Sequence, residues 1–138
     1  MPHGRVRLVD VATTELDRLD WGARRDMVAD QMLLSRMKTG EPEIFATVQG
    51  EGTSAGVPSV FVRLADCNLR CRWCDTKYTW DWNTHDRAAE TVELPVDEIA
   101  RRVLAIAGTG VRNAVFTGGE PLLQQDELVL LAERLRES

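Results

Sequence analysis

Three cysteines close together are the residues of this chain with the clearest chemistry. They are Cys67, Cys71 and Cys74, spaced C-x-x-x-C-x-x-C, and the 138-residue sequence has no other cysteine. Thiolates of this kind hold iron–sulfur clusters, and a four-iron cluster used only for electron transfer takes four of them. Three thiolates leave one iron open, where the amino and carboxylate groups of S-adenosylmethionine could bind for one-electron reductive cleavage.

Two other uses of the same cysteines stay open at this point. Zinc accepts three cysteines and a histidine, but His85 lies eleven residues after Cys74 and His3 is far upstream, so neither offers a compact fourth ligand. Cys71 and Cys74 alone have the C-x-x-C spacing of a redox pair, which would leave Cys67 surplus. An odd number of neighbouring cysteines argues against the disulfide framework of a small secreted protein.

Composition indicates one globular domain that acts on small molecules. The hydrophobic content of 43% and the charged content of 28% are ordinary for a globular protein. A net charge of -5 argues against a protein that coats nucleic acid, because such proteins use clustered cations to replace phosphate counterions. No apolar run approaches the roughly 18 residues of a membrane span, and no secretory signal is visible, so we expect a cytoplasmic protein without a membrane partner.

The elements that must position the cysteines begin after a distinct N-terminal segment. Apolar residues recur there at loosely helical spacing among many charges, namely Leu16, Leu19, Met27, Val28, Met32, Leu33 and Met37. This pattern predicts a helical or disordered extension over 1–41, followed by a core domain over 42–138. Met32 and Met37 are also candidate later translation starts.

The core domain begins with short β-rich runs. Residues 43–49 predict a strand or loop that enters a site, and 50–53 predict a turn. The run 59–64 is dense in β-branched and aromatic residues and predicts a buried strand directly before the cysteines. The polar residues 75–94 predict a long irregular excursion.

A second strand and two helices follow. Pro95 marks the start of a helix that stops at Gly108, and 111–117 predict the second strand. After a tight loop at 118–121, an amphipathic helix is predicted over 125–136, with Leu128, Leu131 and Leu135 facing inward. Two successive strand, loop and helix units predict an α/β fold with a parallel sheet.

Five motifs, taken in order, resemble the radical S-adenosylmethionine (SAM) superfamily and, within it, 7-carboxy-7-deazaguanine synthase. They are Glu43-Ile-Phe, Val48-Gln-Gly-Glu-Gly52, Phe61-Val-Arg-Leu64, Cys67-Asn-Leu-Arg-Cys71-Arg-Trp-Cys74-Asp-Thr76 and Thr117-Gly-Gly-Glu-Pro121. The resemblance runs from about Glu43 to Gln124. It implies a partial (β/α) barrel of the radical SAM type, of which this chain would carry the N-terminal portion only.

The resemblance also implies an activity. Members of this family convert 6-carboxy-5,6,7,8-tetrahydropterin to 7-carboxy-7-deazaguanine, a precursor of queuosine and related 7-deazapurines. They use S-adenosylmethionine, a [4Fe–4S] cluster and Mg²⁺, and the implied chemistry is hydrogen abstraction, ring contraction and loss of ammonia. An electron donor such as flavodoxin or ferredoxin is implied as a partner.

Site residues follow from the resemblance, position by position. The cluster ligands would be Cys67, Cys71 and Cys74, and the Mg²⁺ ligand would be Thr76. The S-adenosylmethionine site would comprise Trp73, Cys74, Asp75, Gly119 and Glu120, with Gly118 and Gly119 letting the backbone approach the methionyl amine. The substrate site would comprise Val48, Gln49, Gly50, Arg63 and Thr117. Without the resemblance, Trp73 would read as a packing residue and Arg63 as a solvated cation on a strand edge.

Two departures from the family pattern bear on activity. Asp66 occupies a position where these proteins usually carry a small residue, most often glycine, and a carboxylate there would tend to lower the cluster potential. A barrel of about six strand–helix units needs roughly 190 residues by proportion to the eight-unit barrel, whereas this chain ends at Ser138 after two units. We therefore expect a C-terminally truncated chain that carries the cluster half of the enzyme. The alternative is that a second copy, in a homodimer, or a separate chain completes the barrel. Rival functions are a radical activase of a partner protein and a non-catalytic cluster-binding module.

Overall fold

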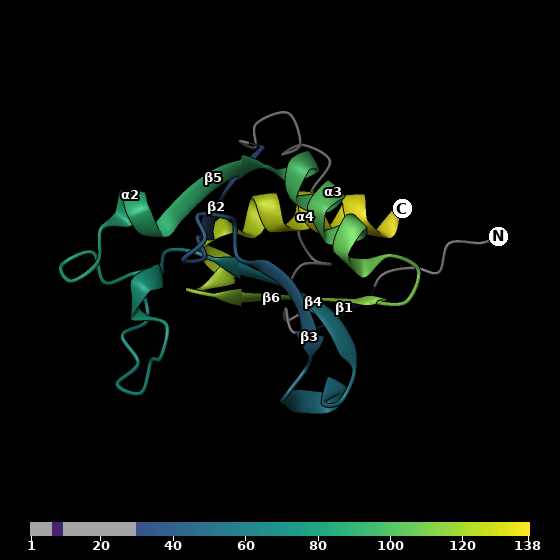
Figure 1. The fold of residues 1–138 in the computed structure, drawn as a ribbon, viewed down its shortest axis with the longest axis horizontal. Coiled ribbons are helices and arrows are strands. Elements are labelled where there is room, and N and C mark those ends of the chain that lie inside the picture. The colour runs from purple at the N-terminus through teal and green to yellow at the C-terminus, as the bar shows by residue number, and fades with distance from the viewer. Residues whose placement is uncertain (1–6, 10–29) are drawn as a thin grey trace.

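A mixed six-stranded sheet forms the frame of the molecule (Figure 1). The computed structural model describes residues 7–9, as backbone, and 30–138. The strands are β1 (Arg7–Val9), β2 (Gln31–Ser35), β3 (Ile44–Val48), β4 (Pro58–Leu64), β5 (Thr91–Pro95) and β6 (Asn113–Gly118). The helices are α2 (Arg87–Glu90), α3 (Val96–Ala107) and α4 (Gln125–Arg136), with short 3₁₀ turns η1 (Gly52–Ser54), η2 (Lys77–Thr79) and η3 (Pro121–Gln124).

The parallel pair β4 and β6 lies at the centre of the sheet, whose order is β1-β6-β4-β2-β5, with β3 pairing beside β4. Side chains alternate across a strand. On β4, Val60, Val62 and Leu64 are therefore fully buried on one face, while Phe61 and Arg63 point to the other. The buried face packs against α3 and α4.

The two long helices confirm the sequence prediction. α3 begins directly after Pro95 and ends at Gly108, whose φ of 53° suits glycine. α4 buries the three leucines predicted to face inward, Leu128, Leu131 and Leu135. Strands β4 and β6 also lie where they were predicted, which confirms two parallel strand–helix units.

The helix prediction was wrong for residues 31–35, which form strand β2. Met32 and Leu34 are fully buried in the same core as α3 and α4, an alternation that fits a strand rather than a helix. β2 pairs antiparallel with β5 along its whole length. Leu16, Leu19, Met27 and Val28 of the predicted extension lie outside the described residues. The boundary after residue 41 stays a prediction, although β2 already belongs to the core sheet.

The predicted excursion over 75–94 is shorter and more ordered than its polarity suggested. Its last residues form β5, so the sheet contains antiparallel strands beside the parallel pair. Its middle carries η2 and α2, and Figure 1 shows this teal segment projecting beyond the end of the sheet. The irregular prediction is therefore wrong for 91–94, because the partner strand β2 lies about sixty residues away in the sequence.

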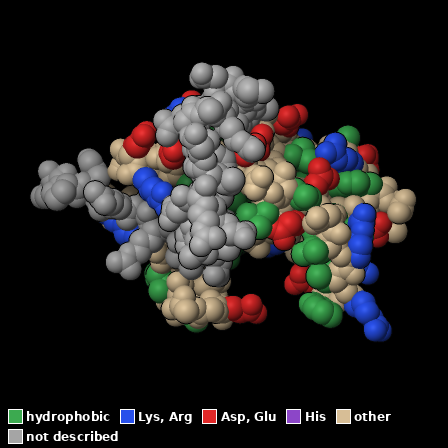
Figure 2. All heavy atoms as spheres, turned by 180° about the vertical axis from the view of Figure 1, so that it is seen from behind, with side chains coloured by type: hydrophobic (Ala, Val, Ile, Leu, Met, Phe, Trp, Pro, Cys, Tyr) green, Lys and Arg blue, Asp and Glu red, His purple; other side chains and the backbone are tan. Residues whose placement is uncertain are grey.

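Charged side chains are scattered among apolar and polar ones on the rear face (Figure 2). Figure 2 shows acidic and basic side chains interspersed on the visible part of the rear face. Within the described part of the chain, no helix is long and apolar enough to cross a bilayer.

Candidate active site

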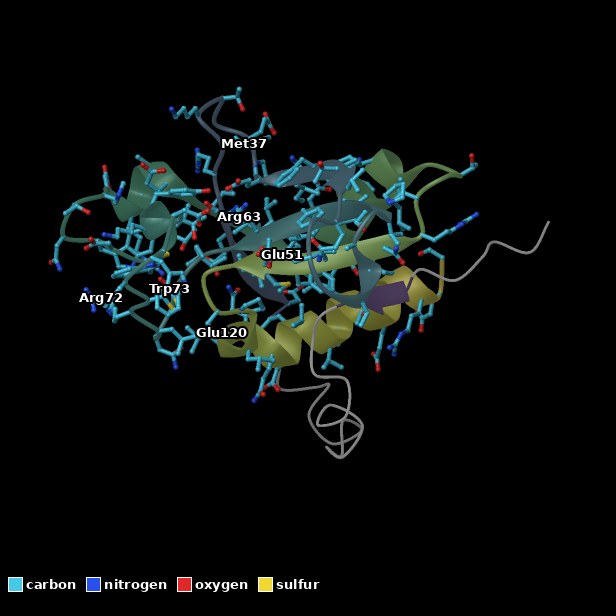
Figure 3. All side chains as sticks on the ribbon, turned by 90° about the horizontal axis from the view of Figure 1, so that it is seen from below. Met37, Glu51, Arg63, Arg72, Trp73 and Glu120 are labelled. Carbon is cyan, nitrogen blue, oxygen red and sulfur yellow. The ribbon has the colours of Figure 1, made fainter. Side chains whose placement is uncertain are left out.

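Two loops leave the carboxyl ends of the parallel strands β4 and β6. The cysteine loop follows Leu64, and the loop Gly118–Pro121 follows Thr117. Leu64 and Gly118 are register partners, so both loops leave the sheet at the same level. The carboxyl edge of parallel strands is the usual position of ligand sites in α/β folds. Figure 3 shows Trp73 and Glu120 at this end of the molecule.

The two loops are bonded to each other through their backbones. Gly119 N–H donates to the Leu64 carbonyl at 2.9 Å, and Glu120 N–H donates to the Asp66 carbonyl at 2.9 Å. A Cβ at Gly118 or Gly119 would collide with the Leu64 or Asp66 backbone, respectively. Both glycines are therefore required by the contact between the loops, a reason additional to the predicted approach of a ligand amine.

Gln124 strengthens the same junction and was missed by sequence reasoning. Its side-chain oxygen accepts from Leu33 N–H at 2.7 Å, and its Nε2 donates to the carbonyls of Leu33 at 2.9 Å and Ala65 at 3.2 Å. One amide thus connects η3, strand β2 and the residue that directly follows β4. A glutamine after a turn carries no sequence signal for such contacts.

The three cysteines are unpaired by disulfide bonds and open to solvent. Cys71 is exposed, whereas Cys67 and Cys74 are partly exposed. Cys74 N–H donates to the Cys71 carbonyl at 3.2 Å, which folds the last four residues of the motif into a turn. Cys67 Sγ donates to the Leu69 carbonyl at 3.4 Å.

Cys74 has the most distinctive environment. Trp80 Nε1 donates to its sulfur at 3.4 Å, and Thr76 Oγ1 lies 3.7 Å from the same atom. The Trp80 hydrogen bond, helped by Thr76, lowers the pKa of Cys74 below its ordinary value, although burial and the Asp75 carboxylate oppose this shift. A lower pKa favours the thiolate, which is the form that binds metals.

This donor set suits a cluster better than a single ion. In the described ranges 7–9 and 30–138, no three His, Cys, Asp or Glu side chains converge as they would around one metal ion. His85, the nearest histidine to the cysteines in sequence, lies 3.7 Å from a Glu90 oxygen instead. Three accessible thiols on one loop fit a cluster, because each thiolate then binds a different iron. Among the described residues, zinc therefore has no histidine as a fourth ligand, and His3 lies outside them.

The other predicted cofactor residues surround this loop. Trp73 has 85% of its surface exposed. Glu120 uses one carboxylate oxygen to accept from Leu122 N–H at 3.0 Å, which caps η3. Asp75 is exposed, and the Thr76 carbonyl accepts two hydrogen bonds from Thr79, so the Thr76 backbone is held firmly beside Cys74.

Arg63 and Thr117 are register partners on adjacent strands, and both belong to the predicted substrate site. Arg63 Nε donates to Glu43 Oε1 at 2.8 Å, and its side chain is only 19% exposed. The Tyr78 hydroxyl donates to both Glu43 oxygens at 3.3 and 3.4 Å. Burial is the main reason that the pKa of Tyr78 is raised above 10.0, with Arg63 opposing and Glu43 adding to the shift.

Arg63 therefore lies on a central strand, and the description of a solvated edge cation does not apply. The roles of Glu43 and Tyr78 were missed by sequence reasoning, since 20 residues separate Glu43 from Arg63 and 35 separate it from Tyr78. The only signal for Glu43 in the sequence was its place in the motif Glu43-Ile-Phe, which marks the residue without revealing its partners.

Val48, Gln49 and Gly50 lie toward the other end of β4. Val48 is the register partner of Pro58, five residues before Arg63, a separation of roughly 17 Å along a strand. Val48 and Gly50 are exposed, whereas Gln49 is buried and its side-chain oxygen accepts from Gly50 N–H at 2.9 Å. The structure thus does not bring this segment beside Arg63 along the sheet, and its substrate role stays a prediction.

A cavity of about 410 Å³ lies beside Glu43 and Tyr78, the two residues that are hydrogen-bonded around Arg63. Its lining includes Glu43 and Tyr78, together with Arg36, Met37, Lys38, His85 and Glu90. Figure 3 shows Met37 and Arg63 on the side of the molecule away from Glu120. The volume is in the range of small-molecule sites.

Comparison with known proteins agrees with these features. A 7-carboxy-7-deazaguanine synthase from Pyrobaculum aerophilum is 52% identical over 83 residues, which cover 60% of this chain and 34% of that protein. The synthase of the same name from Hyperthermus butylicus is 48% identical over 93 residues, covering 67% of this chain and 36% of that protein. The chain therefore spans about a third of the length of these relatives.

A solved structure and a family model extend the comparison. The crystal structure of QueE from Escherichia coli matches with a TM-score of 0.56 and 26% identity, covering 86% of this chain and 54% of that chain. The model of the radical SAM superfamily matches residues 62–138, more than half of the chain. By this match and by its cysteine loop, the chain belongs to the radical SAM superfamily, whose members use a [4Fe–4S] cluster and S-adenosylmethionine.

Proposed function

We propose that this chain carries the cluster-binding part of a radical SAM synthase that converts 6-carboxy-5,6,7,8-tetrahydropterin to 7-carboxy-7-deazaguanine. The observation that carries the proposal is the junction of the cysteine loop with the loop Gly118–Pro121, in a chain up to 52% identical to synthases of that name. The same junction would serve a radical activase, but Val48-Gln-Gly-Glu-Gly52 and Asp75-Thr76 favour the synthase.

Three thiolates would hold the cluster, those of Cys67, Cys71 and Cys74. When bound, the cluster would supply the electron for reductive cleavage of S-adenosylmethionine. The free carboxylate oxygen of Glu120 and the backbone at Gly119 would bind the methionyl amine, since Glu120 already uses its other oxygen to cap η3. The exposed Trp73 indole would provide a flat surface for the adenine.

Arg63 would orient the pterin carboxylate. Glu43 fixes the Nε side of the guanidinium, and Tyr78 fixes Glu43, so the two terminal nitrogens of Arg63 keep one orientation. A guanidinium held in this way can bind a carboxylate through two parallel hydrogen bonds. Thr117, its register partner, would contact the same substrate from the neighbouring strand.

Mg²⁺ binding by the Thr76 hydroxyl is part of the proposal. A single hydroxyl supplies one hard oxygen ligand, so substrate and water would complete the coordination. A flavodoxin or ferredoxin as electron donor, a homodimer and a cytoplasmic location likewise remain predictions.

The deciding experiment is anaerobic reconstitution of the full chain, followed by iron and sulfide analysis and an assay with S-adenosylmethionine and the carboxylated pterin. We expect about four irons and four sulfides per chain. The Cys71→Ser variant, which removes one ligand, should lose most of them. One zinc without sulfide would overturn the cluster. Four irons with S-adenosylmethionine cleavage but no pterin turnover would indicate the activase, and four irons with neither reaction would indicate the non-catalytic module.

A further inference from the structure

Asp66, the residue before the first cysteine, has an unusual backbone. Its φ is 67°, and among the described residues it is the one non-glycine residue with a positive φ. This left-handed conformation is disfavoured for residues with a Cβ, and glycine adopts it without that penalty. A strained residue beside a site indicates that its side chain or its position is used.

Every polar group of Asp66 is engaged, and each contacts a different residue. Its N–H donates to the Thr79 carbonyl at 2.8 Å, and its carbonyl accepts from Glu120 N–H at 2.9 Å. One carboxylate oxygen accepts from Trp82 Nε1 at 3.2 Å, and the other accepts from Arg87 Nη2 at 3.0 Å. The Arg87 guanidinium also lies over the Trp82 ring, 5.7 Å from its centre. We call Asp66, Trp82 and Arg87 the Asp66 latch.

The latch connects Asp66 with Arg87, toward the end of the segment 75–94 that follows the cysteines. Arg87 is the first residue of α2, whose cap is Asp86, and its carbonyl accepts from the Thr91 hydroxyl at the start of β5 at 2.7 Å. Residues 80–87 thus contact the cysteine loop at both ends, through Trp80 at Cys74 and through the latch at Asp66. The backbone contacts of Asp66 need only a left-handed residue, whereas the latch needs its carboxylate.

We propose that Asp66 is a positioning residue for the cluster loop, and that Arg87 neutralises its carboxylate while the latch holds residues 80–87 against that loop. This inference rests on the proposed cluster site. The lowering of the cluster potential expected for an isolated carboxylate is then offset by the neighbouring guanidinium. Removing either charge alone should shift the potential, and in opposite directions, because nearby charge tunes cluster potentials.

The first test uses the chain without a cluster. Asp66→Gly removes the strain of the left-handed backbone but also removes the carboxylate of the latch. Asp66→Asn keeps a residue type that tolerates the left-handed conformation, and it keeps a side-chain oxygen that can accept from Trp82. We expect Asp66→Gly to raise the rate of amide exchange and limited proteolysis within 80–90 about fivefold, the effect of losing one or two hydrogen bonds, and Asp66→Asn to raise it less. Unchanged or slower exchange in Asp66→Gly would overturn the latch.

The second test measures the reduction potential of the reconstituted protein. Arg87→Met should lower the potential, Asp66→Asn should raise it, and the double variant should return close to the parent value. Arg101→Met is the matched control, because Arg101 pairs with Glu98 on the outer surface of α3. Shifts of the same sign in both single variants would overturn the charge pairing. If the protein binds no cluster, the proposed function fails, while the exchange test still decides on the latch.

Discussion

The indole Nε1 of Trp80 donates a 3.4 Å hydrogen bond to the sulfur of Cys74, and the guanidinium of Arg70 lies 4.4 Å from the centre of the same indole ring. Trp80 therefore connects two residues of the cysteine loop with the segment that follows it. Hydrogen bonds to a ligand sulfur reduce its negative charge and raise the reduction potential of a cluster.

Trp80→Phe should lower the potential of the reconstituted protein and speed its loss of iron to a chelator. An aromatic ring for Arg70 to contact is kept, while the donor to Cys74 is removed. Spectroelectrochemistry and chelator kinetics measure the two effects. Trp73→Phe, measured without S-adenosylmethionine, serves as the control, because no hydrogen bond joins Trp73 to a cysteine sulfur among the described residues. Equal potentials for Trp80→Phe and the parent would contradict this role.

Arg63→Lys should weaken binding of the carboxylated pterin about tenfold to a hundredfold, the loss expected for a charge-assisted bidentate pair. Glu43→Gln should weaken binding less, because it only loosens the orientation of Arg63. Isothermal titration of the reconstituted protein measures both. If Arg63→Lys binds as well as the parent, the pterin carboxylate lies elsewhere, and the cavity beside Tyr78 becomes the next candidate.

Gly119→Ala should cost about 2 kcal/mol of folding free energy or displace the loop after β6, because its Cβ would collide with the Asp66 carbonyl. Gly110→Ala is the matched control, since a Cβ there meets no atom within 4 Å. Urea denaturation compares the two. A stability of Gly119→Ala equal to that of the control would show that the contact between the loops is not required.

Leu34→Ala should destabilise the protein by about 2–5 kcal/mol, as expected for a leucine with no exposed surface. The exposed Leu122→Ala should change stability little. This comparison, made by urea denaturation, tests whether β2 belongs to the core. A small effect of Leu34→Ala would support a dispensable extension over 1–41.

Glu98→Gln should lower the melting temperature slightly at pH 7, and the difference should vanish in acid. Hydrogen bonds from Arg101 and Arg102 lower the pKa of Glu98 from 4.5 to about 2. A lowered pKa means that the stabilisation is present above the unfolded pKa and is lost as pH falls toward 2. Thermal melts from pH 7 to 2 measure it, with Glu93→Gln on β5 as the control. A gap between Glu98→Gln and the parent that widens below pH 4 would contradict this assignment.

Local pattern was enough to predict the central elements. The dense β-branched run before Cys67, the helix after Pro95 and the amphipathic helix with Leu131 inward each show a periodicity set by neighbouring residues, and each lies where it was expected. The cysteine spacing likewise predicted the radical SAM superfamily, to which the chain belongs, because ligand chemistry depends on residue type and order.

Long-range pairing was decided by the tertiary structure alone. Residues 31–35 and 91–95 are strands because each completes the hydrogen bonds of the other, and neither segment reveals a partner sixty residues away. The same holds for Glu43 beside Arg63 and for Trp80 beside Cys74. In each case the contact depends on how the backbone folds between the two residues, which periodicity does not encode. The sequence alone therefore predicts the three cysteines as candidate ligands, while the contacts that surround them, such as the Trp80 hydrogen bond to Cys74, required the fold.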